Sequence, residues 1–489
     1  MNRSPDDSPR RSPFRTRLIA GLLAIGLLVL VAGISLYRSS TQAHPSAETA
    51  MADSEPARVA DEDLHRPTRL PDRVILTFAG DPARTAAVNW RTDLSVSRGV
   101  AQIAVAGDNR EFQDAARQIA ARTEPFTSRI NEAHFHSVVF EDLSPGTRYA
   151  YRVGDGQNWT EWFHFSTAST NVEPFTFLYF GDAQTELKPL WSRVVREAFT
   201  NAPKARFLLH AGDLVNDPNG DAQWGEWFQA GGWLNAMTPN VMTPGNHEYH
   251  KVGLFKTLEL TPHWRPQFTL PENGPAELAE TVYTFDYQGV RFISLNSNER
   301  QQEQVPWLEH VLATRPQRWT IITFHHPIYS ASGIRTESEL ERNALLRNLW
   351  QPVFDRHRVD LVLQGHDHTY ARSGLVSGGE QPVTEKNIPE GVTARSPTSG
   401  TVYVVSVSGP KMYELPDSAS TEFERVAENT QLFQIITIDG GRLIYEARTA
   451  TGLPYDGFVL EKQSHGPNRL IEQIPATPAR LRPRAGNGE

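Results

Sequence analysis

The sequence predicts a small all-β sandwich followed by a larger, layered α+β domain, with a transmembrane helix near the N-terminus. Three observations support this fold class. Short runs rich in β-branched and aromatic residues, separated by turn signals, fill residues 71–170. Apolar strands alternate with longer amphipathic segments over residues 172–462. An uncharged apolar run covers residues 18–36 and directly follows several arginines.

Composition limits the function classes that need to be considered. The chain has 489 residues, enough for more than one domain. Its formal net charge is -9, and its Lys and Arg residues are scattered, so we expect no nucleic-acid partner. The absence of cysteine excludes disulfides, thiolate zinc sites and a cysteine nucleophile. His and carboxylate side chains therefore remain as the residues able to bind metals.

The N-terminal sequence predicts export of the folded part. As a helix, residues 18–36 nearly span a hydrocarbon core of ~30 Å. The preceding arginines favour a cytoplasmic segment at 1–17 and a single-pass protein of the cell membrane whose folded part is extracytoplasmic, periplasmic or extracellular. The alternative is secretion after signal cleavage near residues 41–43, although a signal h-region usually has only ~7–15 residues. Residues 37–70 read as a flexible stalk, because they are polar and lack an apolar period.

Two further segments carry local signals. The stretch 142–149, which ends in Tyr149, resembles the corner before a late strand in fibronectin type III domains, in which a tyrosine packs against the preceding turn. The resemblance implies a fibronectin type III-like sandwich at residues 71–170. Residues 463–489 are polar and contain several prolines and arginines, which predicts a disordered tail.

Five predicted strands end directly in residues that could bind metals or transfer protons. In chain order these residues are Asp182 and Gln184, Asp213, Asn246 and His247, His325 and His326, and His366 and His368. The carboxyl ends of strands line the ligand crevice in layered sheets, so these side chains can converge on one site. Any one of these motifs alone more often has a structural role; the ordered set is what indicates function.

The ordered set Asp-x-Gln, Gly-Asp, Gly-Asn-His-Glu, His-x-Pro and Gly-His-x-His resembles the calcineurin-like metallophosphoesterase superfamily. With the fibronectin-like leading domain, the chain is most similar to purple acid phosphatases over about residues 70–460. The resemblance implies an αββα metallophosphoesterase domain at 172–462. It also implies one metal at Asp182 and His368, a second at Asn246, His325 and His366, and Asp213 bridging the two. By the same resemblance His247 is the general acid, and His326 either contacts the substrate phosphate or packs nearby.

This ligand set is chemically consistent with phosphate ester hydrolysis. Carboxylate and amide oxygens mixed with imidazole suit Fe, Mn or Zn. Two such ions ~3.5–4 Å apart stabilise both oxygens of an in-line displacement, and they lower the pKa of bound water enough to supply a bridging hydroxide. The sequence thus predicts hydrolysis of a phosphate ester by a metal-bridging hydroxide outside the cytoplasmic membrane.

Two positions depart from the purple acid phosphatase pattern. Gln184 replaces the small residue of the first motif, and Asn216 stands where a tyrosine three residues after the bridging aspartate would bind the first metal. Gln184 is long enough to fill that coordination position, which makes it a tentative ligand. Because a neutral amide then replaces an anion, we expect two divalent ions.

Three functions remain open on the sequence alone. The first is an acid phosphatase-like phosphomonoesterase, and the second is a phosphodiesterase with the same chemistry. The third is a non-catalytic cell-surface binding protein that uses its fibronectin-like domain. The nearly complete ligand set favours the enzymes.

Overall fold

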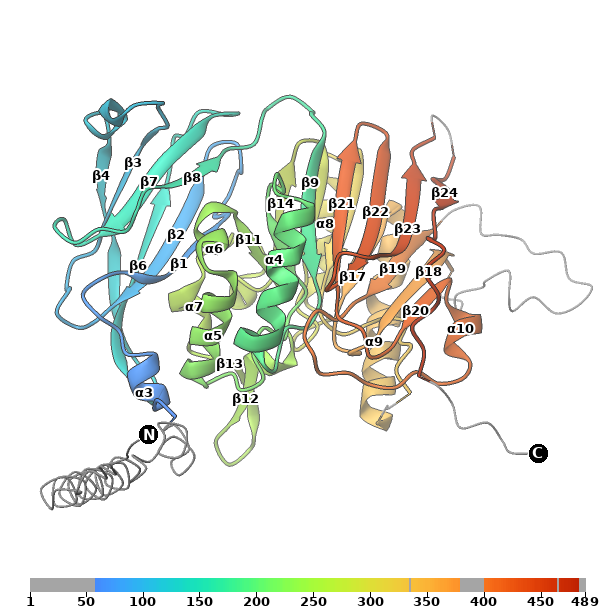
Figure 1. Ribbon diagram of the computed structural model, residues 1–489. Coiled ribbons are helices and arrows are strands. Elements are labelled where there is room, and N and C mark those ends of the chain that lie inside the picture. Colours follow the sequence, from blue (N-terminus) through green and yellow to red (C-terminus); the bar gives the residue numbers. More distant parts are fainter. Residues whose placement is uncertain (1–57, 334–335, 379–399, 464–465, 483–489) are drawn as a thin grey trace, which may run out of the picture. The chain divides into compact units, whose positions relative to one another are not determined.

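The computed structural model describes residues 58–333, 336–378, 400–463 and 466–482. The chain divides into two units, Met1–Ala60 and Asp61–Glu489. Every helix and strand assigned in the described residues belongs to the second unit (Figure 1).

The predicted transmembrane helix requires a correction. Within the described ranges, the structure has no helix that combines the length and the apolarity needed to cross a membrane. The segment 18–36, on which the prediction rested, lies outside those ranges, as does 1–17. In the described residues the fold class is therefore an all-β domain followed by a layered α+β domain.

The leading domain is a sandwich of two antiparallel sheets. One contains β1 (Asp72–Thr77), β2 (Ala86–Thr92), β6 (Glu132–Phe140) and β5 (Arg122–Thr127) in that order; the other contains β4 (Arg117–Ala120), β3 (Val100–Val105), β7 (Arg148–Gly154) and β8 (Phe163–Ser166). Alternate side chains such as Trp90, Phe140 and Tyr151 are buried between the sheets. The Tyr149 hydroxyl accepts the backbone N–H of Ser144 at 2.8 Å, which is the predicted corner contact.

His136 is a buried titratable group inside this sandwich. Its ring stacks on Trp90 with centroids 5.2 Å apart, and its two nitrogens lie 2.8 Å from the hydroxyls of Thr92 and Thr123. Burial, together with the neighbouring His134, lowers the pKa of His136 to about 4. The folded sandwich therefore favours the neutral imidazole.

We expect His136→Gln to weaken the acid sensitivity of the fold. Between pH 6.5 and about 4, unfolded His136 binds a proton that folded His136 does not, so the wild-type free energy of unfolding falls as pH decreases through this window. This pKa shift corresponds to a total loss of about 3 kcal/mol in the free energy of unfolding. Urea titrations from pH 4 to 7.5 give the free energy of unfolding at each pH. Its slope against pH should be shallower in the variant by the equivalent of up to one bound proton. Equal slopes in wild type and variant would contradict this assignment.

Two sheets pack face to face in the second domain. The first continues from the sandwich through β11 (Asn240–Met242), β10 (Leu208–His210), β9 (Phe175–Phe180), β21 (Leu432–Asp439), β22 (Arg442–Thr449), β23 (Pro454–Glu461) and β24 (Arg469–Glu472). The second runs β14 (Tyr283–Tyr287), β15 (Val290–Ser294), β16 (Trp319–Thr323), β17 (Leu361–Gln364), β19 (Thr401–Val405), β18 (Tyr370–Val376) and β20 (Arg425–Ala427). Aromatic side chains such as Phe177, Phe207 and Phe292 fill the core between them.

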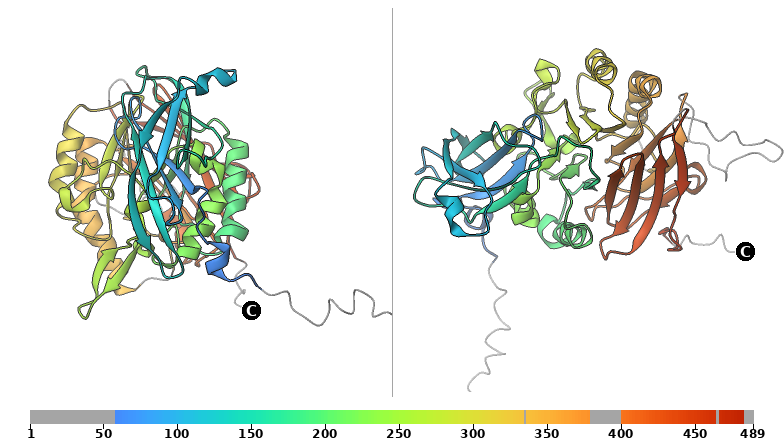
Figure 2. Two further views of the ribbon diagram at one scale, coloured as in Figure 1. Left: turned by 90° about the vertical axis from the view of Figure 1, so that its left-hand side faces the viewer. Right: turned by 90° about the horizontal axis from the view of Figure 1, so that it is seen from above.

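Helices cover the outer faces of both sheets, giving αββα layers. The segment Leu187–Trp191 and helices α4 (Ser192–Asn201), α5 (Asp221–Gly231) and α6 (Trp233–Met237) pack on one side, and α8 (Gln304–Ala313) and α9 (Glu337–His357) on the other. Figure 2 shows the yellow and orange helices on the side of the sheets opposite the green ones. Short helices and a hairpin complete the connections: Asn246–Glu248, α7 (Trp264–Gln267), Ala276–Leu278, α10 (Ala419–Glu422), and β12 (Tyr249–Val252) with β13 (Thr257–Leu260).

The two domains share one sheet. Strand β1 of the sandwich pairs in parallel with β11, with Thr77 opposite Asn240. Beside this junction a buried ion pair joins Arg73 of β1 to Asp221 of α5 at 2.7 Å, and both side chains are almost fully shielded from solvent. The sandwich is thus built into the scaffold of the second domain.

Two predicted irregular segments are partly ordered. Residues 61–64 of the expected stalk form α3 (Asp61–Leu64), and the following carbonyl of His65 accepts a hydrogen bond from buried Arg91 at 3.0 Å. The expected tail contributes strand β24, and farther along the Arg480 N–H donates to the Tyr455 hydroxyl at 3.0 Å. The prediction of disorder was wrong there because β24 is an edge strand in which no side chain is fully buried, so its sequence carries no apolar alternation.

Candidate metal centre

The structure brings all the predicted ligand side chains to the carboxyl ends of neighbouring strands. Asp182 follows β9, Asp213 follows β10, Asn246 follows β11, His325 follows β16, and His366 and His368 follow β17. Strands β9, β10 and β11 are parallel to one another, as are β16 and β17, so these ends lie on the same side of each sheet. The site is therefore built from short turns on rigid strands.

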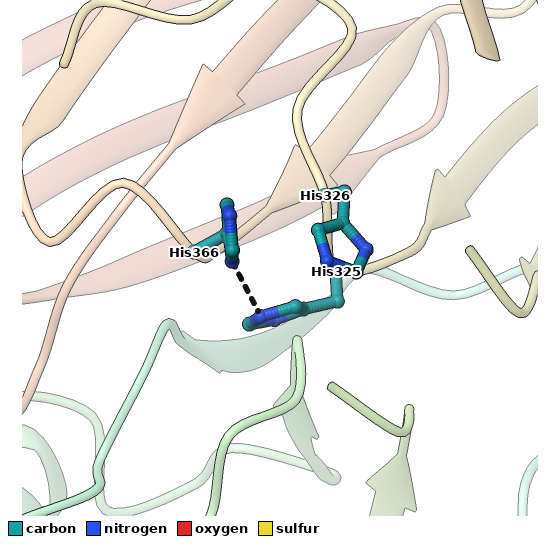
Figure 3. Close-up of side chains that lie close together, drawn as sticks. All are labelled: His325, His326 and His366. Atoms are coloured by element: carbon teal, nitrogen blue, oxygen red, sulfur yellow. Dashed lines mark hydrogen bonds between the residues drawn. The ribbon is translucent and has the colours of Figure 1, made fainter. Parts of the chain in front are cut away.

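Three predicted ligands form one compact set. The Oδ1 atom of Asn246 lies 2.8 Å from Nδ1 of His366 and 3.0 Å from Nε2 of His325. The two imidazole nitrogens are 3.3 Å apart, and Figure 3 shows the contact between these rings. His325 is fully buried, whereas Asn246 and His366 are partly exposed, so the set lies at the boundary between the core and solvent.

The two aspartates lie beside this set. Asp213 Oδ2 is 3.2 Å from His325 Nε2, and Asp182 Oδ2 is 3.1 Å from His368 Nε2. Ligand atoms of Asp182, Asp213 and His325 all fall within 4.8 Å of one another. The Asp182 and His368 pair and the Asn246-containing set are thus adjacent, with Asp213 close to both.

Buried oxygen atoms near the aspartates fit a bound cation. Gln184 Oε1 is buried without a hydrogen-bond partner in the described residues, and Asp182 Oδ2 likewise makes no hydrogen bond there. Leaving such atoms uncompensated is costly, and metal coordination would satisfy them. The mixture of carboxylate, amide and imidazole donors is also one that transition-metal ions accept.

The electrostatics favour positive charge at this position. Burial by itself would lower the pKa of His325, but Asp213 and Asp182 raise it to about 9. Burial opposes ionisation of Asp213, yet His325 and His247 hold the pKa of this carboxyl well below its usual range. Two buried carboxylates therefore stabilise a cation placed between the imidazoles.

The backbone at the ligands is held in an uncommon conformation. Asp213, His366 and His368 have φ values of 51°, 76° and 52°, in the left-handed region that non-glycine residues rarely adopt. Such strain is concentrated at functional sites. The chain also approaches the ligands closely, because a Cβ atom added at Gly365 would lie 2.2 Å from Asp182 Oδ1.

His247 lies beside the cluster, with its ring orientation fixed by the backbone. Its Nδ1–H donates to the carbonyl oxygen of Asn216 at 2.6 Å, and its own backbone N–H donates to Asp213 Oδ1 at 2.8 Å. The side chain lines a cavity of about 120 Å³ that is also lined by the predicted ligands Asp213, Asn246, His366 and His368. Since Nδ1 is engaged, Nε2 is the nitrogen available for proton transfer.

The two tentative residues have defined positions. Gln184 Nε2 donates to Asp213 Oδ2 at 2.8 Å, which places its amide at the aspartate. His326 Nδ1 lies 2.8 Å from the Ser297 hydroxyl, and its ring centroid is 4.4 Å from that of His366 (Figure 3). His326 therefore lies beside the cluster, and ligand atoms of His325, His326 and His366 fall within 4.8 Å of one another; its contact with a substrate phosphate stays a prediction.

Sequence reasoning assigned no role to several residues of the site. Glu248 is fully buried and accepts the backbone N–H groups of Asp213, Leu214 and Gly245 at 2.7–2.8 Å. Burial and Asp213 raise the pKa of Glu248, and the N–H groups oppose that rise. The cavity is also lined by Ser332, Glu339 and Tyr413. These three lie outside any motif, so only their positions in the fold reveal them.

Clustered oxygen and imidazole donors at the strand ends of an αββα fold define the class of two-metal hydrolases. Comparisons with known proteins agree. Residues 71–167 match the purple acid phosphatase N-terminal domain, and residues 175–370 match the calcineurin-like phosphoesterase family.

Relatives and solved structures point to the same group. A probable purple acid phosphatase 20 from Arabidopsis thaliana is 27% identical over 373 residues, covering 73% of this chain and 79% of the relative. The Fe(3+)-Zn(2+) purple acid phosphatase 12 of the same plant is 24% identical over 343 residues, covering 66% and 71%. The purple acid phosphatase PPD1 from yellow lupin (Lupinus luteus) seeds superposes with a TM-score of 0.65 at 18% identity, over 81% of this chain and 75% of that one.

The chain thus contains a calcineurin-like phosphoesterase domain at residues 175–370, preceded by a purple acid phosphatase N-terminal domain at residues 71–167. It is a phosphoesterase hydrolase, which confirms the enzyme class predicted from the sequence. The family and the clustered ligands support a dinuclear metal centre, as predicted.

Proposed function

We propose that this protein is a phosphomonoesterase that uses two metal ions. The main support for this proposal is the cavity of about 120 Å³, which is lined by His247 and by residues of the ligand cluster. The cavity sets one candidate proton donor, His247, beside the ligand cluster, which suits departure of a single leaving group from a phosphate held there. Hydrolysis of diesters is the competing function.

Each metal position is assigned to residues of this chain. Asp182 and His368 would hold one ion, and Asn246, His325 and His366 the other, with Asp213 shared between them. The buried Gln184 Oε1 supports Gln184 as an additional ligand of the first ion. Both ions are proposed to be divalent Fe, Mn or Zn, since these donors suit such ions and no anionic tyrosine stands at position 216. When bound, the ions activate water and neutralise phosphate charge.

His247 would protonate the leaving group. The Asn216 carbonyl accepts the Nδ1–H, so the transferable proton belongs to Nε2. As the P–O bond breaks, Nε2 gives this proton to the departing alkoxide, and the neutral ring remains oriented by Asn216. General acid catalysis of this kind typically contributes ~10²–10⁴-fold.

Release of inorganic phosphate tests the monoesterase proposal. Wild-type protein reconstituted with Zn²⁺, Mn²⁺ or Fe²⁺ should hydrolyse alkyl and aryl monoesters with a kcat/KM at least about tenfold above that for matched diesters, a difference of about 1.4 kcal/mol. A preference for the diesters would overturn the proposal in favour of the competing function.

We further propose that the enzyme acts outside the cytoplasm. The support is the N-terminal sequence, in which arginines precede the apolar residues 18–36, a pattern typical of exported proteins. Protease added to intact spheroplasts should digest the catalytic domain. Recovery of full-length protein only from the cytosol would contradict export.

A further inference from the structure

We infer that Glu339 is a positioning residue of the metal centre, an outer carboxylate that orients the ligand His366. This inference rests on the proposed role of His366 as a metal ligand. No motif pointed to Glu339, because it lies in the first turn of α9 and His366 follows strand β17.

The two nitrogens of His366 face different partners. Nδ1 points into the ligand set, 2.8 Å from Asn246 Oδ1 and 3.3 Å from His325 Nε2. Nε2 lies on the opposite side of the ring, 3.5 Å from Glu339 Oε1. The His366 side chain is 12% exposed and that of Glu339 26%, so solvent only partly screens this pair. Binding of an ion at Nδ1 would leave Nε2–H directed at the carboxylate.

Glu339 is itself fixed by the start of its helix. Its Oε2 accepts the backbone N–H of Thr336 at 2.7 Å and the Thr336 hydroxyl at 2.8 Å. Thr336 and Glu339 thereby form a capping box at the beginning of α9. One carboxylate oxygen is thus held by the cap, and the other lies 3.5 Å from His366 Nε2.

This geometry has a known physical consequence for metal ligands. A carboxylate that accepts the second N–H of a metal-bound imidazole fixes its tautomer and ring orientation and increases its basicity. Loss of such a partner typically costs ~10–100-fold in metal affinity. Glu339 also lines the cavity, so the competing role is a direct effect of its charge on the substrate.

The metal affinity of the Glu339→Gln variant distinguishes orientation of His366 from a direct effect on the substrate. Metal-free full-length protein is titrated with Zn²⁺ against a competing chelator, and the two dissociation constants are determined. We expect one of them to rise about 10–100-fold and the other to change little. Glu337→Gln is the matched control, because Glu337 is exposed in the same helical turn and its loss removes the same charge from the helix start. It should change neither constant by more than about twofold.

A second variant keeps the inference testable if Glu339→Gln folds poorly. Thr336→Val removes the hydroxyl donor but keeps the backbone donor to Glu339, so a smaller loss of affinity at the same ion is expected. Unchanged affinities in a folded Glu339→Gln protein, including the case in which only KM for monoesters changes, would overturn the inference. Wild-type protein that fails to bind two ions would instead refute the proposed metal centre.

Discussion

Asp213→Asn is expected to remove most of the bound metal and nearly all of the hydrolytic activity. The carboxylate stands between the two ligand groups, and an amide cannot neutralise the charge of two ions. One Asp213 oxygen accepts the His247 N–H and the other accepts Gln184 Nε2, so an asparagine NH₂ group would also face a donor. Since an outer partner alone is worth ~10–100-fold, loss of a shared ligand should cost more than about 100-fold in affinity for at least one ion.

Elemental analysis after dialysis and kcat/KM with p-nitrophenyl phosphate measure this effect. Asp217→Asn is a suitable control, because Asp217 is partly exposed and pairs with Arg129 on the surface. The control should retain both ions and near wild-type turnover. An Asp213→Asn protein with two bound ions and unchanged turnover would show that the two-metal assignment is wrong.

His247→Ala is expected to have an effect that depends on the leaving group. An alkyl alkoxide needs a proton as the P–O bond breaks, whereas p-nitrophenolate departs without one. The variant should therefore lose ~10²–10⁴-fold in kcat/KM for alkyl phosphates and distinctly less for activated aryl phosphates. Metal content should not change, because the sequence and the structure place His247 beside the ligand set and not within it.

A series of monoesters with graded leaving-group pKa decides the role. If His247 acts as the proton donor, the dependence of log kcat/KM on leaving-group pKa should be steeper in the variant than in wild type. Equal losses for all substrates would indicate that His247 stabilises charge on the phosphoryl group instead. His250→Ala serves as the control, since His250 lies three residues farther on and outside the residues that line the cavity.

Much of the site could be predicted because its ligands sit where buried strands end. A run such as Phe175–Phe180 is recognisable by its apolar residues, and the polar residue after it must lie at the sheet edge. The same logic applies to His325 after β16 and His366 after β17. Local sequence therefore predicts both the strand and the predicted ligand that follows its carboxyl end.

The remaining residues depend on contacts that no local pattern encodes. Glu339 meets His366 only because α9 packs against the second sheet, and the Asn216 carbonyl reaches His247 through a turn of the backbone. The strand at Arg469–Glu472 was also missed, because β24 pairs along an edge and buries little apolar surface. Such features follow from tertiary packing rather than from periodicity.

Because the two domains share one sheet, the second domain depends on the sandwich for its structure. Removing the leading domain up to about residue 171 would remove β1. Strand β11 would then become an edge strand, open to pairing with other chains. The same removal would also leave the Asp221 carboxylate buried without Arg73. We therefore expect the second domain not to fold properly without β1. A chimera that takes its leading domain from a relative must keep a strand in the place of β1 and an arginine in the place of Arg73.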